Sequence, residues 1–500
     1  MSTDQNQSKE QTVAIIGGGP AGLTAAYELQ KRSKTHKPVV LEGGKLVGGI
    51  ARTESHKGFR FDIGGHRFFT KVPEVNAMWH EVLGKDFITV PRLSRIYYRG
   101  RFYDYPLNLF NALFNLGPYE SVRIVLSYLK WRLFPHKTED TYEQWVMNRF
   151  GGRLYAHFFR SYTKKVWGIP PSTIRADWAA QRIKNLSLIK AVWNAISGAN
   201  DTASLIEEFE YPRLGPGMMW EKTRDIIREK GGEVRMQSVV DRVFREGNRV
   251  TGIKVTEWAE DGKPAKTYTQ TADHFVNSMD LRTLINCMDP PPPKEVIDAA
   301  NRLKYRDFLI VTLVLDHDDP FPDTWIYVHS KEVKVGRIQN FRSWSKEMLP
   351  QPNRASIGME FFCNEGDELW QMADEDLIKL AGRELEQIGL APASSVMDGA
   401  IIRQLKAYPV YDGEYHEALE VVQKWLQTLE NFQTVGRNGL HRYNNQDHSM
   451  LTAMYAARNI LGEKLDIWEV NLERSYNEEF QTKEAAEAVK GEARSAPAPA

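Results

Sequence analysis

The hydrophobic pattern near the start of the chain predicts a buried parallel strand, a tight turn and a helix. Residues 13–16 are apolar and lead directly into the motif Gly17-x-Gly19-x-x-Gly22, after which small and apolar residues continue. Gly17 allows the turn, Gly19 lets a pyrophosphate approach the backbone, and Gly22 permits close contact between helix and strand. The first turn of such a helix offers free N–H groups and a partial positive charge to phosphates.

A second apolar run supports this interpretation. Residues 38–41 end at Glu42, twenty residues after Gly22. An acidic side chain at the tip of the second strand can accept hydrogen bonds from the ribose of an adenosine. The alternative, a glycine turn with an unrelated surface Glu, accounts less well for the combined pattern. The pattern therefore predicts a dinucleotide-binding protein.

The remaining pattern divides the chain into three regions and predicts an α/β fold. Apolar and basic positions at helical spacing near residues 106–205 predict a helical cap. Runs rich in β-formers predict the sheet of an α+β substrate domain, at residues 308–315, 324–328 and 356–361. Segments typical of the strands and of the closing segment of a Rossmann-like domain recur at separate places along the chain. This domain is therefore expected to be discontinuous. The expected divisions are 12–80, 205–290 and 430–465 for this domain, 81–204 for the cap, 291–429 for the substrate domain, and 1–11 and 483–500 for disordered tails.

Length, charge and cysteine content exclude several classes of function. The chain has 500 residues, which is long enough for two or more domains, and a formal net charge of zero, which implies no nucleic-acid partner. Its two cysteines, Cys287 and Cys363, argue against a disulfide framework or a cysteine-rich metal site. No metal-ligand spacing is found around His441, Asp447 and His448, so no metal is expected. With neither a signal peptide nor a transmembrane segment in the pattern, we expect a cytoplasmic protein.

The basic amphipathic stretch of the predicted cap has two interpretations. Arg123, Lys130, Arg132 and Lys137 alternate there with apolar residues. Such a stretch could touch a membrane surface. It is more often core on one side and solvated charge on the other. Peripheral membrane contact stays open at this point, as does the oligomeric state.

The block after Glu42 indicates which dinucleotide is bound. Residues 43–53 contain two glycine pairs, which allow backbone approach to a ligand, and Arg52, which could neutralise phosphate. This block resembles the E-(x)n-G-G-R-x-x-T signature of the flavin amine oxidase superfamily. The superfamily includes protoporphyrinogen oxidases, carotenoid desaturases, monoamine oxidases and the more distant UDP-galactopyranose mutases. The resemblance implies FAD as the cofactor and an FAD-binding domain of the glutathione-reductase type.

Three later segments extend the resemblance. Residues 233–240 look like the strand that brings backbone to the adenine, and residues 272–278 look like the strand that returns to the FAD domain. Residues 434–437 resemble the segment that closes over the flavin. The cofactor-binding residues implied in this way, together with those of the glycine motif, are Gly17, Gly19, Gly22, Glu42, Gly49, Arg52, Gly65, Val240, Gly436 and Arg437.

A closer motif similarity is to the UDP-galactopyranose mutases. Residues 162–168 are similar to their Y-T-x-K-x-W-G, in which aromatic residues hold uracil and sugar. Residues 436–447 are similar to their G-R-L-G-x-Y-R-Y-x-D-M-D beside the flavin, and residues 65–70 resemble their P-H-x-F-H-T. Residues 305–306 stand where the family has a Y-R-S whose arginine meets the diphosphate. The candidate substrate residues are Tyr162, Thr163, Trp167, Arg182, Arg306 and Tyr408, and the candidate catalytic residues are His66, Tyr443 and Asn445.

The chain also departs from the mutase motifs. Phe69 replaces their second His, Asn445 replaces the first Asp of the C-terminal motif, and His441 replaces its first Tyr. These changes remove groups close to the flavin and the sugar. They favour an FAD-dependent oxidoreductase that transfers hydride from a small organic substrate to the flavin. The alternative is a flavin-dependent, non-redox nucleotide-sugar mutase, and a third reading is a flavin-binding protein without catalysis.

The candidate side chains also have structural interpretations. His66 could hydrogen-bond a flavin edge or satisfy a buried carbonyl. Tyr162 and Trp167 could stack on a ring or form ordinary core, and Tyr408 could line a pocket or only pack. Paired carboxylates are scarce in the motifs, which fits hydride transfer because that reaction does not require an acid–base residue.

Overall fold

A parallel sheet of five strands carries the glycine motif in the computed structural model, which describes residues 10–105, 107, 109–176 and 208–471. The sheet order is β20-β13-β1-β2-β9, with β1 in the centre, and every neighbouring pair is parallel. The strands are β1 Gln11–Ile16, β2 His36–Leu41, β9 Glu233–Arg235, β13 His274–Asn277 and β20 Phe432–Thr434. Helix α1 (Pro20–Arg32) follows β1 and packs against α17 (Gln446–Ile460). The predicted Rossmann-like fold is confirmed.

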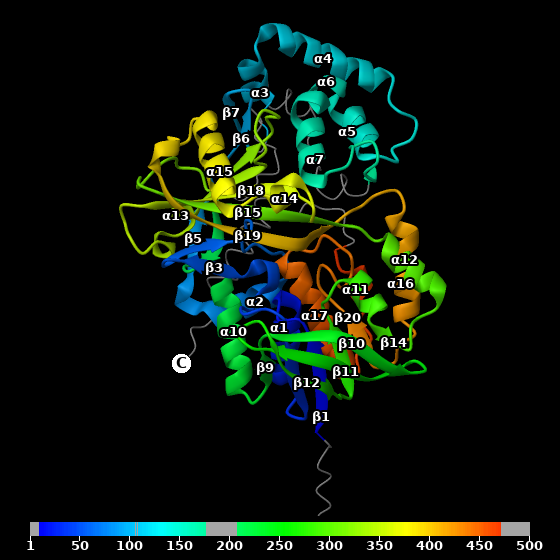
Figure 1. Cartoon of the computed structure of the whole chain (residues 1–500). Coiled ribbons are helices and arrows are strands. Elements are labelled where there is room, and N and C mark those ends of the chain that lie inside the picture. The colour runs from blue at the N-terminus through cyan, green and yellow to red at the C-terminus, as the bar shows by residue number, and fades with distance from the viewer. Residues whose placement is uncertain (1–9, 106, 108, 177–207, 472–500) are drawn as a thin grey trace, which may run out of the picture.

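A smaller sheet and several helices complete this end of the molecule (Figure 1). The sheet order is β12-β11-β10-β14, with bounds Pro264–Gln270, Arg249–Trp258, Ser238–Glu246 and Met288–Asp289. The helices are α2 Pro73–Leu83, α10 Gly217–Glu229, α11 Leu281–Asn286, α12 Lys294–Arg302 and α16 Tyr415–Leu426. Residues 291–429 were expected to lie in the substrate domain. The apolar faces of α12 and α16 instead join the core around β1, because their helical stripes pack against each other there.

The region expected to form the substrate domain contains a seven-stranded mixed sheet, called the substrate sheet below, of order β19-β15-β18-β17-β16-β6-β7. Its strands are β19 Val396–Pro409, β15 Tyr305–Leu315, β18 Ala355–Cys363, β17 Arg337–Asn340, β16 Trp325–Val328, β6 Ser94–Tyr98 and β7 Arg101–Asp104. Along β15, Phe308 and Ile310 face one core while Leu309 and Val311 face the other. Helix α15 (Asp374–Ile388) covers the second face. The three β-rich runs expected from the sequence form β15, β16 and β18.

The expected cap boundary needs a correction at its start. Residues 81–204 were assigned to a helical cap, but β6 and β7 form a hairpin within the substrate sheet. The chain turns at Arg99 and Gly100, both with positive φ, and each flanking strand carries two aromatic residues in a row. Strand β5 (Phe87–Pro91) pairs with β8 (Glu208–Pro212) outside the cap. Tertiary pairing therefore recruits this segment into sheets.

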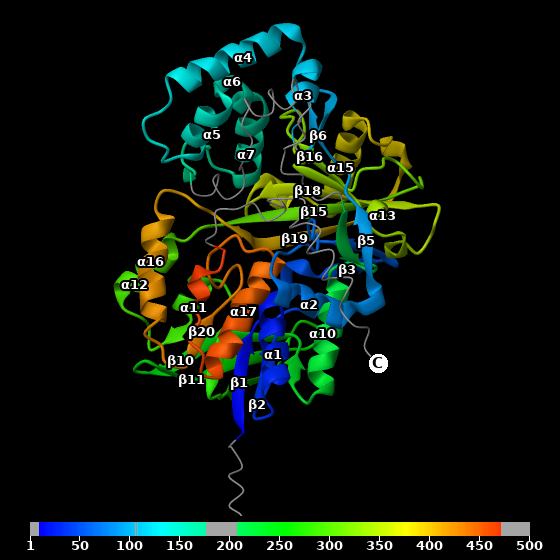
Figure 2. The same cartoon turned by 180° about the vertical axis from the view of Figure 1, so that it is seen from behind.

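The helical cap itself lies at the end of the molecule farthest from the five-stranded sheet (Figures 1 and 2). Its elements are α3 Leu109–Leu116, α4 Pro118–Leu133, α5 Tyr142–Phe150, α6 Gly152–Leu154, the π-helix η3 Tyr155–Phe159 and α7 Arg160–Trp167. Within the described part of the chain, no helix combines the length and apolarity needed to cross a bilayer.

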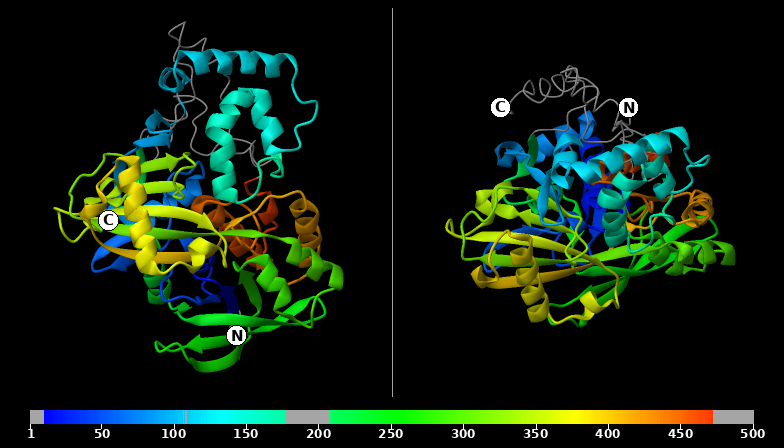
Figure 3. Two further views of the ribbon diagram at one scale, coloured as in Figure 1. Left: turned by 45° about the horizontal axis from the view of Figure 1, so that its top comes forward. Right: turned by 90° about the horizontal axis from the view of Figure 1, so that it is seen from above.

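Short elements connect these layers. They are β3 Thr53–His56, β4 Phe59–Asp62, α13 Phe341–Trp344, α14 Glu368–Gln371, η1 Gly49–Ala51, η2 Gly84–Asp86, η4 Lys346–Met348, η5 Ala393–Ser395 and η6 Ile467–Glu469. The antiparallel pair β3–β4 leads from the glycine-rich block to residues 64–66. The substrate sheet lies between the cap and the FAD-type domain, so its strand ends can meet residues from both (Figure 3).

Candidate functional site

The glycine motif forms a cradle whose geometry excludes side chains at two positions. Gly17 begins the turn after β1 with φ +98°. A Cβ on Gly22 would collide with the carbonyl oxygen of Gly17. At Gly19, the residue before α1, the nearest atom to such a Cβ is the Cα of Gly49, at 3.8 Å. A Cβ on Gly19 would thus make only ordinary contact with Gly49, and the bare backbone of Gly19 at a helix N-terminus suits the approach of a pyrophosphate.

Glu42 lies beside this cradle at the end of β2. Its Oε2 accepts a hydrogen bond of 2.7 Å from the N–H of Gly18, and its Oε1 accepts one of 2.7 Å from Gly44. Each carboxylate oxygen has a second lone pair, so ribose hydroxyl groups can still bind to this half-buried side chain. The carbonyl of Glu42 accepts from Ser238 at 2.7 Å, which brings the start of β10 to the same place. The side chain of Val240 itself packs in the core.

Arg52 links the glycine-rich block to the substrate sheet. Its Nη1 donates to the carbonyl of Gly49 at 2.9 Å and to Oε1 of Gln404 in β19 at 3.0 Å. Its Nε donates to Glu54 at 2.6 Å, so the charge is paired within the protein. These contacts hold Gly49 opposite Gly19.

His66 follows a glycine pair that needs its small size. A Cβ on Gly65 would collide with the ring of Trp325, although Gly65 itself is exposed. Nδ1 of His66 lies 3.0 Å from the carbonyl oxygen of Gly64. Burial, with a further effect of Arg437, lowers the pKa of His66 to about 3, so the imidazole is neutral. Because a carbonyl can only accept, Nδ1 carries the proton and Nε2 is left as an acceptor.

Aromatic residues from three segments gather beside this loop. Trp167 at the end of α7 has its ring centroid 6.3 Å from that of Tyr408 and 6.2 Å from that of Tyr443. Tyr408 and Tyr443 stack at 5.4 Å with an interplanar angle of 19°. Tyr162, one turn earlier on α7, packs against the same core, and Thr163 is buried beside it. The structure thus brings Tyr162, Trp167, Tyr408 and Tyr443 together from segments far apart in the sequence.

Arg337 connects these aromatic residues and was missed by the sequence analysis. From the start of β17, its Nε donates to the hydroxyl of Tyr162 at 3.1 Å. Its Nη1 donates to the hydroxyl of Tyr408 at 3.2 Å and to Oε2 of Glu360 at 3.2 Å. Burial raises the pKa of Glu360, and the guanidinium of Arg337 opposes that rise. No motif surrounds Arg337 in the sequence; a lone arginine opening a β-rich run is a weak signal.

Arg306 holds the end of the helix that carries Trp167. Its Nε donates to the carbonyl of Val166 at 3.3 Å, and its Nη2 donates to the carbonyl of Phe362 at 3.0 Å. Gly168 ends α7 with φ +71°, and a Cβ there would lie 2.8 Å from Cζ of Arg306. The glycine is therefore needed both for the left-handed turn and for the approach of the guanidinium.

The loop between β20 and α17, residues 435–445, is called the C-terminal loop here. It closes over the first helix and the aromatic cluster. A Cβ on Gly436 would lie 3.1 Å from that of Ala21 in α1. Arg437 donates from Nε to the carbonyl of Asn444 at 2.8 Å, and its Cζ lies 5.0 Å from the ring centroid of Tyr443. Asn445 is exposed at the N-terminus of α17, where its N–H donates to Nδ1 of His448 at 3.3 Å. Asn445 thus caps a helix.

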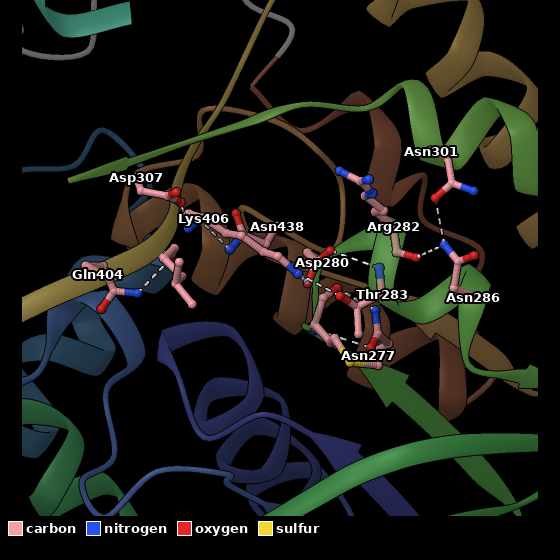
Figure 4. A network of polar contacts seen from close by, with 12 residues as sticks. Asn277, Asp280, Arg282, Thr283, Asn286, Asn301, Asp307, Gln404, Lys406 and Asn438 are labelled. Atoms are coloured by element: carbon pink, nitrogen blue, oxygen red, sulfur yellow. Dashed lines mark hydrogen bonds and ion pairs between the residues drawn. The ribbon is translucent and has the colours of Figure 1, made fainter. Parts of the chain in front are cut away.

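A polar network fixes the strand end that carries Tyr408 (Figure 4). Nζ of Lys406 donates to Oδ2 of Asp280 and to the hydroxyl of Thr283, both at 2.7 Å. The N–H of Lys406 donates to Oδ1 of Asp307 at 2.6 Å, and its carbonyl accepts from Asn438 at 3.0 Å. Two residues before Tyr408, β19 is thereby fastened to the neighbouring strand β15, to α11 and to the C-terminal loop.

Two further residues named in the sequence analysis are Arg182, a candidate substrate residue, and His441, a departure from the mutase motif. Arg182 lies outside the described residues. His441, which replaces a tyrosine of the mutase motif, is fully buried with φ +48° and meets the ring of Tyr305 edge-on at 4.9 Å. Among the residues that the structure describes, no group of three or more His, Cys, Asp or Glu side chains could hold a metal ion.

Comparisons with known proteins agree with this geometry. A family model described as flavin containing amine oxidoreductase matches residues 20–441. Coproporphyrinogen III oxidase of Mycobacterium leprae (strain TN) is 36% identical over 73 residues, which span 14% of this chain and 16% of that relative.

Solved structures match over a much larger share of the chain. A crystal structure of reduced UDP-galactopyranose mutase has a TM-score of 0.78 and 19% identity, and the match covers 92% of this chain and 97% of that one. Putrescine oxidase bound to putrescine has a TM-score of 0.60 and 15% identity, covering 91% of this chain and 99% of that one. These two enzymes share the fold with this chain.

Proposed function

The chain belongs to the flavin-containing amine oxidoreductases, and from this premise we propose that it is an FAD-dependent oxidoreductase acting on a small organic substrate. Family membership confirms the predicted superfamily and FAD as the cofactor. The proposed reaction is transfer of a hydride from a substrate carbon to the flavin. The match to the coproporphyrinogen oxidase spans too little of that protein to carry over its substrate.

The residues of the cradle fit FAD. The bare backbone of Gly19 and the two carboxylate oxygens of Glu42 suit a pyrophosphate and a ribose, respectively. The cofactor-binding roles proposed from the sequence are retained for Gly17, Gly22, Gly49, Arg52, Gly65, Val240, Gly436 and Arg437. When bound, FAD supplies the hydride-accepting ring, and the protein contributes binding, orientation and exclusion of water.

The neutral imidazole of His66 is the observation that carries the oxidoreductase proposal. The pKa of His66 is lowered to about 3, so its imidazole is not an acid near neutral pH. The nearby carboxylate of Glu360 is paired with Arg337 and also accepts from Gln339 at 2.9 Å. Hydride transfer needs no general acid or base on the protein, whereas a reaction with obligatory proton transfer does.

The aromatic residues would then position the substrate. Tyr162 and Tyr408 have their hydroxyl groups held by one guanidinium, and Trp167 and Tyr443 present flat surfaces beside them. Flat, stiff side chains hold a ring or a carbon chain at little cost in conformational entropy. Together they would orient the reacting carbon and keep water away.

Anaerobic mixing tests this proposal. The purified holoprotein is mixed without oxygen with putrescine, coproporphyrinogen III and UDP-galactose in turn, and the flavin absorbance is followed. We expect one class to bleach the flavin, with an oxidised product by mass spectrometry. Trp167→Phe is expected to slow bleaching, whereas Trp258→Phe, at an exposed position in β11, leaves it unchanged. Isomerisation of a nucleotide sugar without net flavin reduction would contradict the proposal.

A nucleotide-sugar mutase is the second candidate. The observation in its favour is that Tyr162, Thr163, Trp167 and Tyr443, all retained from the mutase motifs, are assembled with Arg306 at one place. Against it stand Asn445, which caps α17, and Phe69, which packs against the aromatic core. Neither side chain offers the carboxylate or imidazole found at those positions in the motifs.

A titration separates the two candidates. UDP and UDP-galactose are added to the oxidised and the dithionite-reduced holoprotein while the flavin spectrum is recorded. A saturable change that is strongest in the reduced form, together with a furanose product, would favour the mutase. The absence of any spectral change in both states would leave the oxidoreductase proposal.

A further inference from the structure

The outer face of helix α4 carries an apolar stripe that the rest of the described structure leaves uncovered. The exposed apolar side chains of the helix are Tyr119, Val122, Val125, Leu126, Leu129 and Leu133. Leu133 is 72% exposed, as is Phe134 directly after the helix, and Phe114 on the adjoining α3 is 86% exposed. In a water-soluble protein such a contiguous group marks an interaction surface.

The positions of these residues define a narrow face. At about 100° per residue, the six apolar positions of α4 fall within an arc of about 120° centred on Val122. Arg123 and Lys130 lie along one edge of this arc and Arg132 lies along the other, and all three are exposed. A central apolar stripe with basic residues on both edges is the pattern of a helix that lies flat in a membrane interface, because lysine and arginine stems reach outward to lipid headgroups.

The inner face of α4 is firmly attached to the cap. Ile124 and Tyr128 are buried, and a Cβ on Gly151 would lie 2.8 Å from Cα of Tyr128. Glu120, the one acidic residue of α4, accepts from Arg153 at 2.5 Å, lies 2.9 Å from Nε2 of His157 and lies 3.4 Å from Nη1 of the exposed Arg123. The helix is therefore fixed in place with its apolar stripe outward, and its one carboxylate is already neutralised by basic side chains of the protein.

Charge decides which partner fits this surface. The arc and its edges carry basic residues and no acidic one within α4. Two copies of α4 packed face to face would bring like charges together, with no carboxylate on the face to pair them. An anionic lipid surface offers both a medium for the apolar stripe and negative charge for its edges. The cap also forms one end of the molecule, so α4 can reach a plane without obstruction by the FAD domain (Figures 1 and 3).

We propose that α4 is a membrane-docking helix that binds the protein peripherally to anionic lipid bilayers through Val122, Leu126, Leu129 and Leu133, with Arg123, Lys130 and Arg132 contacting the headgroups. The aromatic cluster lies on the other side of the cap from this face, at the end of α7. This inference is independent of the proposed function, since it involves no residue of the candidate site.

Vesicle flotation with the full-length holoprotein tests the inference. Vesicles of phosphatidylcholine alone are compared with vesicles that also contain phosphatidylglycerol. We expect flotation with the anionic vesicles, little with the neutral ones, and a decrease as salt is raised. The double variant Leu126→Ser/Leu133→Ser is expected to bind at least tenfold more weakly. Its matched control, Leu93→Ser/Met397→Ser, changes exposed apolar residues elsewhere and should bind as the wild type does.

The charge contribution is measured separately. Replacing Arg123, Lys130 and Arg132 by Gln is expected to weaken binding to anionic vesicles by roughly fivefold for each charge. Thermal unfolding and flavin content of every variant should match the wild type, because the altered side chains are exposed.

Four results would overturn the inference. The first is equal flotation of wild type and stripe variant, and the second is equal binding to neutral and anionic vesicles. The third is a stripe variant that unfolds at a lower temperature, which would mean that the protein itself covers the stripe. The fourth is self-association that the stripe variant abolishes without any vesicle binding, which would assign the face to a second copy of the chain.

Discussion

Arg337 donates from Nη1 to Oε2 of Glu360 over 3.2 Å, and the Glu360 side chain is completely buried. The pair joins two adjacent strands of the substrate sheet, β17 and β18, beneath the aromatic cluster. Removing one partner of a buried ion pair is costly because the other charge is left without compensation in a medium of low dielectric constant. The stability of the site is thus expected to depend on both residues together.

Replacing Arg337 by Met is expected to lower the free energy of unfolding by about 3–5 kcal/mol. The double variant Arg337→Met/Glu360→Gln should recover a large part of this loss, because the second change removes the buried charge. Urea unfolding followed by circular dichroism measures both. As a control, Arg242→Met breaks an exposed pair with Asp289 and should cost less than about 1 kcal/mol. Equal losses for single and double variants would contradict the coupling.

Lys165 is expected to hold the segment between β16 and β17 in a fixed conformation. Its Nζ lies 2.7–3.2 Å from four main-chain carbonyl oxygens, of Val328, Ser330, Val333 and Val335. Lys165→Met would remove the donor that these four carbonyl oxygens share, and we expect the free energy of unfolding to fall by at least about 2–3 kcal/mol.

Hydrogen exchange provides the local readout for this variant. Amides in residues 328–337 should exchange faster in Lys165→Met, while those of the five-stranded sheet change little. Lys164→Met, at the exposed neighbouring position, is the control and should resemble the wild type. Uniform exchange throughout the chain would show that Lys165 acts on global stability instead.

Asp62 is expected to make stability depend on pH. Burial raises its pKa to about 7, although hydrogen bonds from Tyr211 and Thr53 act in the opposite direction. Because the folded-state pKa lies above the unfolded value, the stabilising contribution of this proton is complete below about pH 4 and is lost as pH rises through about 7. The change amounts to at most about 1.4 kcal/mol per pH unit.

Comparison of wild type with Asp62→Asn isolates this effect. The wild type should be most stable relative to the variant at about pH 4.5, and the difference should shrink toward about pH 8. Melting temperatures across this range provide the measurement, with Asp104→Asn as a control at an exposed carboxylate. A difference that stays constant with pH would mean that Asp62 does not titrate in this window.

Gly19→Ala is expected to separate cofactor binding from folding. A Cβ at Gly19 has no protein atom closer than 3.8 Å, so the apoprotein tolerates it, but the methyl group would occupy the space assigned to the pyrophosphate. We expect FAD affinity to fall at least tenfold, with the melting temperature of the apoprotein nearly unchanged. Gly413→Ala, where a Cβ meets no atom within 4 Å, is the matched control. Full flavin occupancy in Gly19→Ala would contradict the assignment of this space.

Much of the FAD-binding half could be predicted from the sequence because its signals are local. Gly17, Gly19 and Gly22 lie within one turn and the start of one helix; the positive φ of Gly17 and the contact of Gly22 with the carbonyl of Gly17 are both local requirements. Glu42 follows directly on the second strand of the same unit. Such patterns can be recognised without knowledge of the rest of the fold.

The cap boundary shows where local signals were insufficient. Residues 94–104 were assigned to the helical cap, yet β6 finds its parallel partner in β16, more than two hundred residues later. Similarly, the helical stripes of α12 and α16 were recognisable, but not the core to which they belong. The spacing of residues within a segment does not indicate which distant segment it pairs with or packs against.

The sequence by itself determined the parallel βα unit, the cofactor class and the aromatic motif of α7, since each depends on residue types at short spacing. Only the tertiary structure decided that Tyr162 and Trp167 meet Tyr408 and Tyr443, and that Arg337 connects two of these hydroxyl groups. It also decided which side of α4 is packed and which is exposed. The physical reason is that burial, charge pairing and exposure are set by neighbours brought together through folding, and these neighbours come from segments that the linear pattern cannot relate to one another.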